Sequence, residues 1–178
     1  NFTLVSSTAD EATIKAEAAR CLYCDEICNI CTTVCPNFAN YSYKTEPFTF
    51  RLRKAVRMDD DSIELGDDGV FKIKQGYQVF NIVNFCNECG NCNTFCPTSG
   101  APYKDKPKIC LTISAFNHVE EGYYLAKLKD RNNLIFRQNE HITTLSELSD
   151  EYIYENDYVV ARFRKNDFSL LEARFRTP

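Results

Sequence analysis

Glycine is scarce in this sequence of 178 residues, and the places where it occurs exclude several common nucleotide sites. No glycines stand in a G-x-G-x-x-G arrangement, and none form the G-x-x-x-x-G-K-[ST] pattern of a phosphate-binding loop. The sequence therefore shows no site for a flavin, a nicotinamide or ATP. The six glycines are Gly66, Gly69, Gly76, Gly90, Gly100 and Gly122.

Long apolar runs, a signal peptide and a basic stripe are also missing. The longest apolar stretches fall well short of the roughly 20 residues that a transmembrane helix needs. No charged region followed by an apolar segment opens the chain, so we expect no secretion signal. The net charge is −4, with acidic and basic residues mixed along the chain, which does not favour nucleic-acid binding.

Cysteine, in contrast, is abundant. Nine of the ten cysteines fall in two short runs, and each run ends in Cys-Pro. A secreted disulfide scaffold fits this clustering poorly, so we expect the protein to work in a reducing cytoplasm, with its thiols holding metal. The first run contains Cys21, Cys24, Cys28, Cys31 and Cys35, and the second contains Cys86, Cys89, Cys92 and Cys96.

The second run has the spacing C-x2-C-x2-C-x3-C-P, which is typical of bacterial ferredoxins that bind [4Fe–4S] clusters. Three thiolates three residues apart can surround one cubane, and Pro97 sets the direction in which the chain leaves. In two-cluster proteins the fourth cysteine binds the other cluster, so this run calls for a second one. We predict that one cluster is held by Cys86, Cys89, Cys92 and Cys35.

The first run offers five cysteines for four places. Counting back from Pro36 predicts that the other cluster is held by Cys24, Cys28, Cys31 and Cys96, which leaves Cys21 over. Matching the start of the run to Arg-Cys-Leu-x-Cys uses Cys21 and leaves Cys28 over. The spacing before proline favours the first assignment, and Cys31 and Cys35 have the same role in both.

Zinc is the main alternative for these thiols. Pairs of the form C-x2-C also build tetrahedral zinc sites, and nine thiolates could hold two ions with one to spare. Zinc ribbons, however, place two such pairs apart, whereas three closely spaced cysteines followed by Cys-Pro are typical of a cubane. The spacing therefore favours iron–sulfur chemistry.

Three further residues have side chains that can bind metals but lack a motif. Cys110 stands alone in a predicted strand, and we expect a buried thiol that packs as a small apolar side chain. His118 and His141 have no ligand partner at motif spacing, so we expect ordinary histidines.

Aromatic and acidic residues inside or beside the runs are expected to tune the clusters. Asp25, Glu26 and Glu88 would disfavour reduction through their negative charge if they lie near the iron. A dry shell around the clusters is predicted from Phe38, Tyr41, Phe85 and Phe95.

The sequence predicts an α+β protein: a two-cluster [4Fe–4S] ferredoxin-like core preceded by a helix, with a β-hairpin insertion and a small β-rich C-terminal appendage. The ferredoxin-type domain is predicted over 1–108, with its helix at 8–22 and a β-rich spacer at 48–83. The appendage is predicted over 109–178.

Within these domains, capping and alternation predict individual elements. Thr8 and Glu11 form a capping box for the first helix. Residues 66–69 form the predicted turn of the hairpin, between strands at 62–65 and 70–74. Further strands are predicted at 48–52, 77–83, 109–115, 123–128, 134–136 and 158–163, turns at 130–133 and 165–167, and short helices at 146–154 and 168–175.

Several motifs together resemble a known family. They resemble the C-terminal iron–sulfur region of the family named as the flavoprotein subunit of selenate reductase, related to the iron–sulfur domain of dihydropyrimidine dehydrogenase and the glutamate synthase small subunit. The resemblance covers roughly residues 10 to 108. The motifs that carry it are Glu17–Cys24, Cys28–Cys31, Cys35-Pro36-Asn37, Cys86–Cys92 and Pro102–Lys106.

The resemblance implies that FAD and NAD(P)H bind to a partner domain or subunit. Longer members of that family carry such a domain before the iron–sulfur region and are tied to molybdenum hydroxylases and purine breakdown. We therefore expect this chain to be a C-terminal piece of such a subunit, with a flavoprotein and a molybdenum hydroxylase as partners.

Three functions are consistent with the sequence. The first is an electron-transfer module that relays single electrons between a flavin and a partner in a bacterial oxidoreductase complex, with no substrate site of its own. The second is a free-standing ferredoxin, and the third is a zinc-stabilised interaction protein. The long spacer and the β-rich tail favour the first, because both offer docking surfaces.

Overall fold

The structure is a computed structural model, and it describes residues 10–19, 28–60, 62–128 and 131–176. Helix α1 spans Glu11–Ala19. The Asp10 carboxylate caps it by accepting a hydrogen bond from the Thr13 amide at 2.7 Å. The predicted helix is confirmed over 11–19, with Asp10 at the cap, while Thr8 and the predicted end at Leu22 lie outside the described residues.

The two cysteine runs sit among short elements of similar design. The first run continues through helix α2 (Ile30–Thr33) to strand β1 (Asn40–Lys44). The second follows strand β4 (Tyr77–Ile82) and a 3-10 turn η1 (Val83–Phe85), and it contains helix α3 (Asn91–Thr94). Helix α4 (Pro102–Asp105) then leads to strand β5 (Lys108–Cys110). The predicted strand at 77–83 is confirmed over 77–82, and Val83 begins the 3-10 turn.

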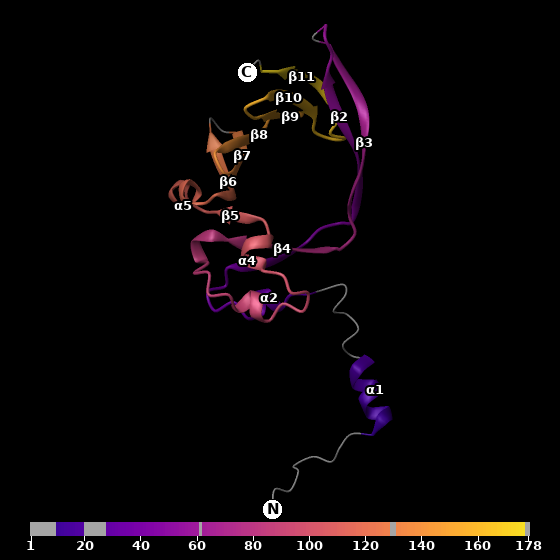
Figure 1. The fold of residues 1–178 in the computed structure, drawn as a ribbon, viewed down its shortest axis with the longest axis vertical. Coiled ribbons are helices and arrows are strands. Elements are labelled where there is room, and N and C mark those ends of the chain that lie inside the picture. Colours follow the sequence, from indigo (N-terminus) through magenta and orange to yellow (C-terminus); the bar gives the residue numbers. More distant parts are fainter. Residues whose placement is uncertain (1–9, 20–27, 61, 129–130, 177–178) are drawn as a thin grey trace, which may run out of the picture.

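One sheet of nine strands connects the cysteine-rich part to the tail, in the order β1-β4-β5-β6-β7-β8-β9-β10-β11 (Figure 1). Strand β5 runs parallel to β4 and to β6, and the remaining pairs in the sheet are antiparallel. The tail strands are β6 (Glu121–Leu128), β7 (Arg131–Gln138), β8 (His141–Glu147), β9 (Glu151–Glu155), β10 (Val159–Arg164) and β11 (Leu170–Phe175). The predicted domain boundary at 108/109 falls within β5, so the sheet runs on across it.

The insertion between β1 and β4 is a long hairpin of β2 (Phe48–Arg57) and β3 (Ile63–Ile73). The hairpin closes beyond Met58, whose amide donates to the Ser62 carbonyl at 2.9 Å. The prediction of a turn at 66–69 is wrong. Gly66 and Asp67 pair regularly with β2. The register shift next to them leaves Asp68 and Gly69 opposite Leu52 as a β-bulge, and Gly69 has φ +100°.

The tail contains three further corrections. The predicted strand at 109–115 ends at Cys110, and helix α5 (Ile113–His118) follows, with the Thr112 hydroxyl accepting from the Ala115 amide at 3.2 Å. The predicted helix at 146–154 is wrong because Ser149 and Asp150 turn the chain between β8 and β9. The predicted helix at 168–175 is wrong because residues 170–175 pair with β10 as strand β11.

Other tail predictions are confirmed. Strands lie where 123–128, 134–136 and 158–163 were predicted, and the turn at 165–167 separates β10 from β11. The turn predicted at 130–133 is wrong over 131–133, because these residues begin strand β7 and pair with β6, while residue 130 lies outside the described residues. The observed chain is mostly strands with short helices.

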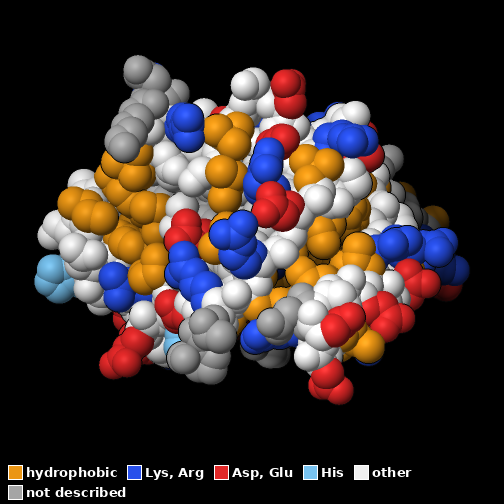
Figure 2. Space-filling model, turned by 90° about the horizontal axis from the view of Figure 1, so that it is seen from above, with side chains coloured by type: hydrophobic (Ala, Val, Ile, Leu, Met, Phe, Trp, Pro, Cys, Tyr) orange, Lys and Arg blue, Asp and Glu red, His pale blue; other side chains and the backbone are white. Residues whose placement is uncertain are grey.

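Many large apolar side chains of the strands are exposed. Seen from above, hydrophobic side chains reach the surface between charged ones (Figure 2). Leu125 and Tyr158 are each 64% exposed. Among the described residues, no helix is long and apolar enough to cross a membrane.

Candidate metal centre

The two cysteine runs fold into matching units. Cys31 lies at the second position of α2 and Cys92 at the second position of α3, and both are buried. In each unit the helix ends just before a Cys-Pro step, at Cys35 and at Cys96. The C-x2-C-x3-C-P pattern therefore produces the same local structure twice.

The loops after the two Cys-Pro steps also match. The third residue after each cysteine has a left-handed backbone, with φ 52° at Phe38 and 58° at Ser99. This bend turns a backbone amide back toward the thiol. The Ala39 amide donates to Cys35 Sγ at 3.2 Å, and the Gly100 amide donates to Cys96 Sγ at 3.3 Å. Such N–H···S bonds stabilise negative charge on sulfur, which suits a cluster ligand.

Burial follows the same order in both units. Cys28 and Cys89 are exposed, the next cysteine of each unit is buried, and Cys35 and Cys96 are half-buried. Cys28 therefore occupies the place in the first run that Cys89 occupies in the second. This equivalence supports the assignment that uses Cys28.

One cysteine of the first run joins three of the second around a common pocket. The pocket is lined by Cys35, Cys86, Cys89 and Cys92, together with Asn40, Asn87, Glu88, Gly90, Asn91 and Tyr103. These are the four cysteines that the spacing assigns to one cluster. A cubane needs one thiolate for each of its irons, so a pocket lined by four cysteines has the residue types that this group requires.

Cys31 of the first run lies near one cysteine of each run. Burial raises the pKa of the Cys31 thiol above its ordinary value, and the neighbouring Cys28 and Cys92 raise it further, while Lys106 opposes the rise. Crowded thiols of this kind need a cation to hold them together as thiolates. Iron fits that requirement.

Cys96 has a different environment. The Thr98 side chain forms a hydrogen bond to its Sγ at 3.3 Å, and this bond lowers the pKa of the Cys96 thiol, with backbone amides of Thr98 and Gly100 and the charge of Lys106 acting in the same direction. A thiol that is easily ionised is a ready ligand. Its predicted partner Cys24, and the alternative ligand Cys21, lie outside the described residues.

The cysteines of the described chain do not converge on a single point. Within residues 10–19, 28–60, 62–128 and 131–176, no three His, Cys, Asp or Glu side chains are grouped as ligands of one metal ion.

Two buried asparagines connect helix α2 of the first unit to the sheet. Asn40 on β1 faces Asn81 on β4, and both are almost fully buried. The Asn40 side chain donates to the Cys31 carbonyl at 3.0 Å and accepts from the Asn81 side chain at 2.9 Å. Buried amide side chains are tolerated when they are hydrogen-bonded in this way. The pair therefore holds α2 at a fixed position against β1 and β4.

The predicted aromatic shell is largely wrong. Phe38 is 70% exposed and Phe95 is 57% exposed, while Tyr41 and Phe85 are also exposed. The left-handed backbone at residue 38 directs the Ala39 amide toward Cys35 Sγ, and it leaves the Phe38 side chain in solvent. The aromatic ring that does line the pocket is Tyr103, which spacing alone did not single out. The sequence feature that could have pointed to Tyr103 is its place in the Pro102–Lys106 motif.

Of the acidic residues, Glu88 lines the pocket, as predicted for a charge near iron. The Glu88 backbone is left-handed, with φ 55°, and it bends the chain between Cys86 and Cys89. Asp25 and Glu26 lie outside the described residues.

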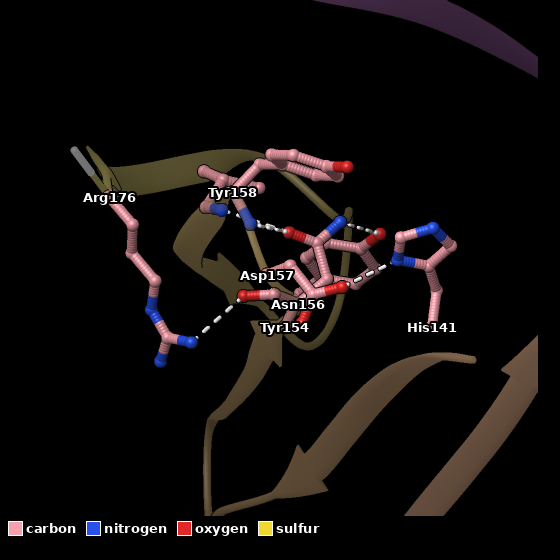
Figure 3. A network of polar contacts seen from close by, with 7 residues as sticks. His141, Tyr154, Asn156, Asp157, Tyr158 and Arg176 are labelled. Atoms are coloured by element: carbon pink, nitrogen blue, oxygen red, sulfur yellow. Dashed lines mark hydrogen bonds and ion pairs between the residues drawn. The ribbon is translucent and has the colours of Figure 1, made fainter. Parts of the chain in front are cut away.

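The isolated metal-binding residue types have ordinary surroundings. Cys110 is 2% exposed on β5 and packs close to Gly122, as predicted for a structural thiol. The His118 ring pairs with the Ser114 carbonyl of its own helix. His141 Nδ1 lies 2.7 Å from Asp157 Oδ2, in a polar network at the β9–β10 turn (Figure 3).

Comparisons with known proteins agree with this centre. Residues 20–99 match the family described as a 4Fe-4S dicluster domain. The chain is also 38% identical, over 127 residues, to the protein named "Putative oxidoreductase YgfK" from Escherichia coli strain K12, a match that covers 71% of this chain and 10% of the relative. The protein of the same name from Escherichia coli O157:H7 matches to the same extent.

The chain thus spans about a tenth of the length of these curated relatives. No solved structure matches it. The match of residues 20–99 to a 4Fe-4S dicluster domain implies that this chain binds two [4Fe–4S] clusters.

Proposed function

We propose that this chain is the electron-transfer part of an oxidoreductase, relaying single electrons between a flavin-containing domain or subunit and a second partner. The observation that carries the proposal is the crossing of Cys35 into the pocket of Cys86, Cys89 and Cys92. Because the two runs share ligands, the two cluster sites must lie close together. When bound, the clusters supply one-electron redox chemistry.

The chain's own residues give this relay two accessible ends. Cys28 and Cys89 are exposed, while Cys31 and Cys92 are buried in one apolar group with Val79. Each predicted cluster therefore has one thiol at the surface and one at the centre. Such an arrangement lets one partner donate at one end while another accepts at the other.

The relatives support an oxidoreductase setting. YgfK is named as an oxidoreductase, and the matched region is a small share of its length. We propose that a flavoprotein that uses NAD(P)H is the donor or acceptor at one end, with a molybdenum hydroxylase at the other, in the cytoplasm. The predicted ligand set for this relay is Cys24, Cys28, Cys31 and Cys96 for one cluster and Cys35, Cys86, Cys89 and Cys92 for the other.

The test is purification of the natural complex under argon, using the tagged chain as bait. We expect a flavin-containing protein to co-purify, and NAD(P)H to bleach the brown cluster absorption in the complex but not in the isolated chain. The Cys92→Ala variant is the matched control, because it should abolish part of the bleaching through loss of a cluster.

A different result would favour a free-standing ferredoxin. In that case the chain purifies alone and acts as a diffusing carrier. The rate at which a flavoprotein reduces it then rises in proportion to the concentration of the chain.

A further inference from the structure

Tyr103 lies where the two cluster sites meet. It is half-buried in α4 and packs against the buried group of Cys31, Val79 and Cys92. It also lines the pocket of Cys35, Cys86, Cys89 and Cys92. Among the described residues, it is the one aromatic side chain on that pocket wall.

The short helix α4 holds this ring in place. Pro102 is buried at the helix start, and the Asp105 carboxylate accepts from the Ala101 amide at 2.6 Å. The Lys104 ammonium lies 5.4 Å from the centroid of the Tyr103 ring, within the range of a cation–π contact. The ring is therefore fixed between an apolar core and a cation.

A ring in this place changes the environment of the pocket. Reduction of a cluster with four thiolate ligands adds negative charge, and water stabilises the more highly charged state. Removing water from the pocket wall therefore disfavours reduction, since burial and solvent access are among the factors that set cluster potentials.

We propose that Tyr103 is a positioning residue that excludes water from the cluster of Cys35, Cys86, Cys89 and Cys92, and so keeps the reduction potential of that cluster lower than that of an open site. The proposal rests on the ligand assignment given under Proposed function. It concerns the isolated chain and needs no partner protein.

The test is a redox titration of the reconstituted chain followed by electron paramagnetic resonance. In Tyr103→Ala we expect one of the two one-electron waves to move to higher potential, and the other to move less. The wave that moves should be the one altered in Cys86→Ser. Tyr103→Phe, which keeps the ring, should restore the original potential, and Tyr158→Ala is the control for loss of an exposed tyrosine ring in the tail.

A second measurement covers the case in which Tyr103→Ala fails to hold iron. Tyr103→Leu keeps apolar bulk but leaves part of the wall open. After transfer to D2O, the reduced pocket cluster of Tyr103→Leu should show stronger deuterium coupling than that of the unaltered protein. Its cluster absorption should also bleach faster in air.

Three outcomes would overturn the proposal: unchanged potentials and deuterium coupling in Tyr103→Ala or Tyr103→Leu, equal shifts of both waves, or the same shift in Tyr103→Phe as in Tyr103→Ala. The last result would assign the effect to the hydroxyl group. None of these outcomes depends on whether a flavoprotein binds, so failure of this proposal is distinguishable from failure of the proposed function.

Discussion

At the scale of single residues, Cys28 and Cys21 compete for one ligand position. The matching units place Cys28 where Cys89 stands, with the same exposure and the same distance in sequence to the next two cysteines. The likeness of the two runs therefore favours Cys28 as the ligand, which experiment can test.

This argument predicts the iron content of two variants. Cys28→Ser should lose about half of the roughly eight irons per chain, because serine is a poor replacement for a thiolate, whereas Cys21→Ser should keep them all. Iron and acid-labile sulfide analysis measures both, and Cys110→Ser serves as a control for a thiol outside the runs. Loss of iron in Cys21→Ser with retention in Cys28→Ser would reverse the assignment.

Thr98 offers a second test at this scale. A bound Cys96 thiolate has no proton, so the 3.3 Å contact requires the Thr98 hydroxyl to donate to the sulfur. This bond stabilises the reduced, more negative cluster. Thr98→Val should lower the potential of one cluster in a redox titration.

The matched control is Thr94→Val, which removes a hydroxyl that donates only to the Gly90 carbonyl at 3.3 Å. Equal shifts in the two threonine variants would show that the contact with sulfur is not the cause.

The sequence predicted that Cys35 would lie with the second run, as the shared pocket shows, but it predicted the surroundings of the cysteines poorly. Cysteine spacing reflects the geometry of the metal group, so the pairing of Cys35 with the second run could be inferred before any coordinates. The position of aromatic side chains depends on backbone bends such as the one at Phe38. The residue types alone do not predict such bends. Tyr103 lines the pocket because α4 folds back onto it, which is a tertiary effect.

At the scale of elements, the long hairpin shows how a local signal can mislead. Gly66-Asp67-Asp68-Gly69 has the composition of a turn, but the acidic stretch that follows Met58 turns the chain instead. The pairing of Phe48 with Ile73 and of Arg57 with Ile63 extends the hairpin over its whole length. Gly69 then takes the bulge conformation that only glycine adopts readily.

The two glycines of this segment make a matched pair. Gly69 has φ +100°, so Gly69→Ala should cost the hairpin roughly 1–2 kcal/mol of local stability. A two-stranded hairpin is marginal by itself, so amides of β2 and β3 should exchange faster with deuterium while the rest of the sheet is unchanged.

Gly66→Ala is the control for this prediction. A Cβ at Gly66 would meet only the flexible Lys54 side chain, at 3.4 Å, and the backbone there is not left-handed. Equal acceleration of exchange in both variants would mean that loss of glycine flexibility, and not the bulge, governs the hairpin.

The two helix predictions in the tail were wrong for a related reason. Residues 146–154 contain good helix formers, but Ser149 and Asp150 form a tight turn, and the Leu148 amide bonds to the Glu151 carbonyl at 2.9 Å. Pairing with β7 and β10 supplies the rest of the stability of β8 and β9. Strand formation here depends on neighbours far along the chain, which a local pattern does not record.

At the scale of the whole molecule, one sheet spans two regions with different sources of stability. The tail strands β6 to β11 form a continuous antiparallel meander with aromatic contacts such as Tyr123 with Phe136, whose ring centroids are 4.6 Å apart. In the cysteine-rich region, the buried apolar group is Cys31, Val79 and Cys92. Two of these three residues are predicted ligands, so much of that core is the metal group itself.

Removal of iron should therefore affect the two regions differently. Chelation under argon removes the irons that would bind Cys31 and Cys92 and leaves crowded thiols in their place. Elements α2, α3, β1 and β4 should therefore lose protection against hydrogen exchange. Strands β7, β8 and β9 should keep most of theirs, because their pairing does not involve a cysteine run. Peptide-resolved exchange before and after chelation, and again after reconstitution, measures the difference. Uniform loss of protection over the whole sheet would mean that β5 transmits the collapse, and that the molecule folds as one cooperative unit.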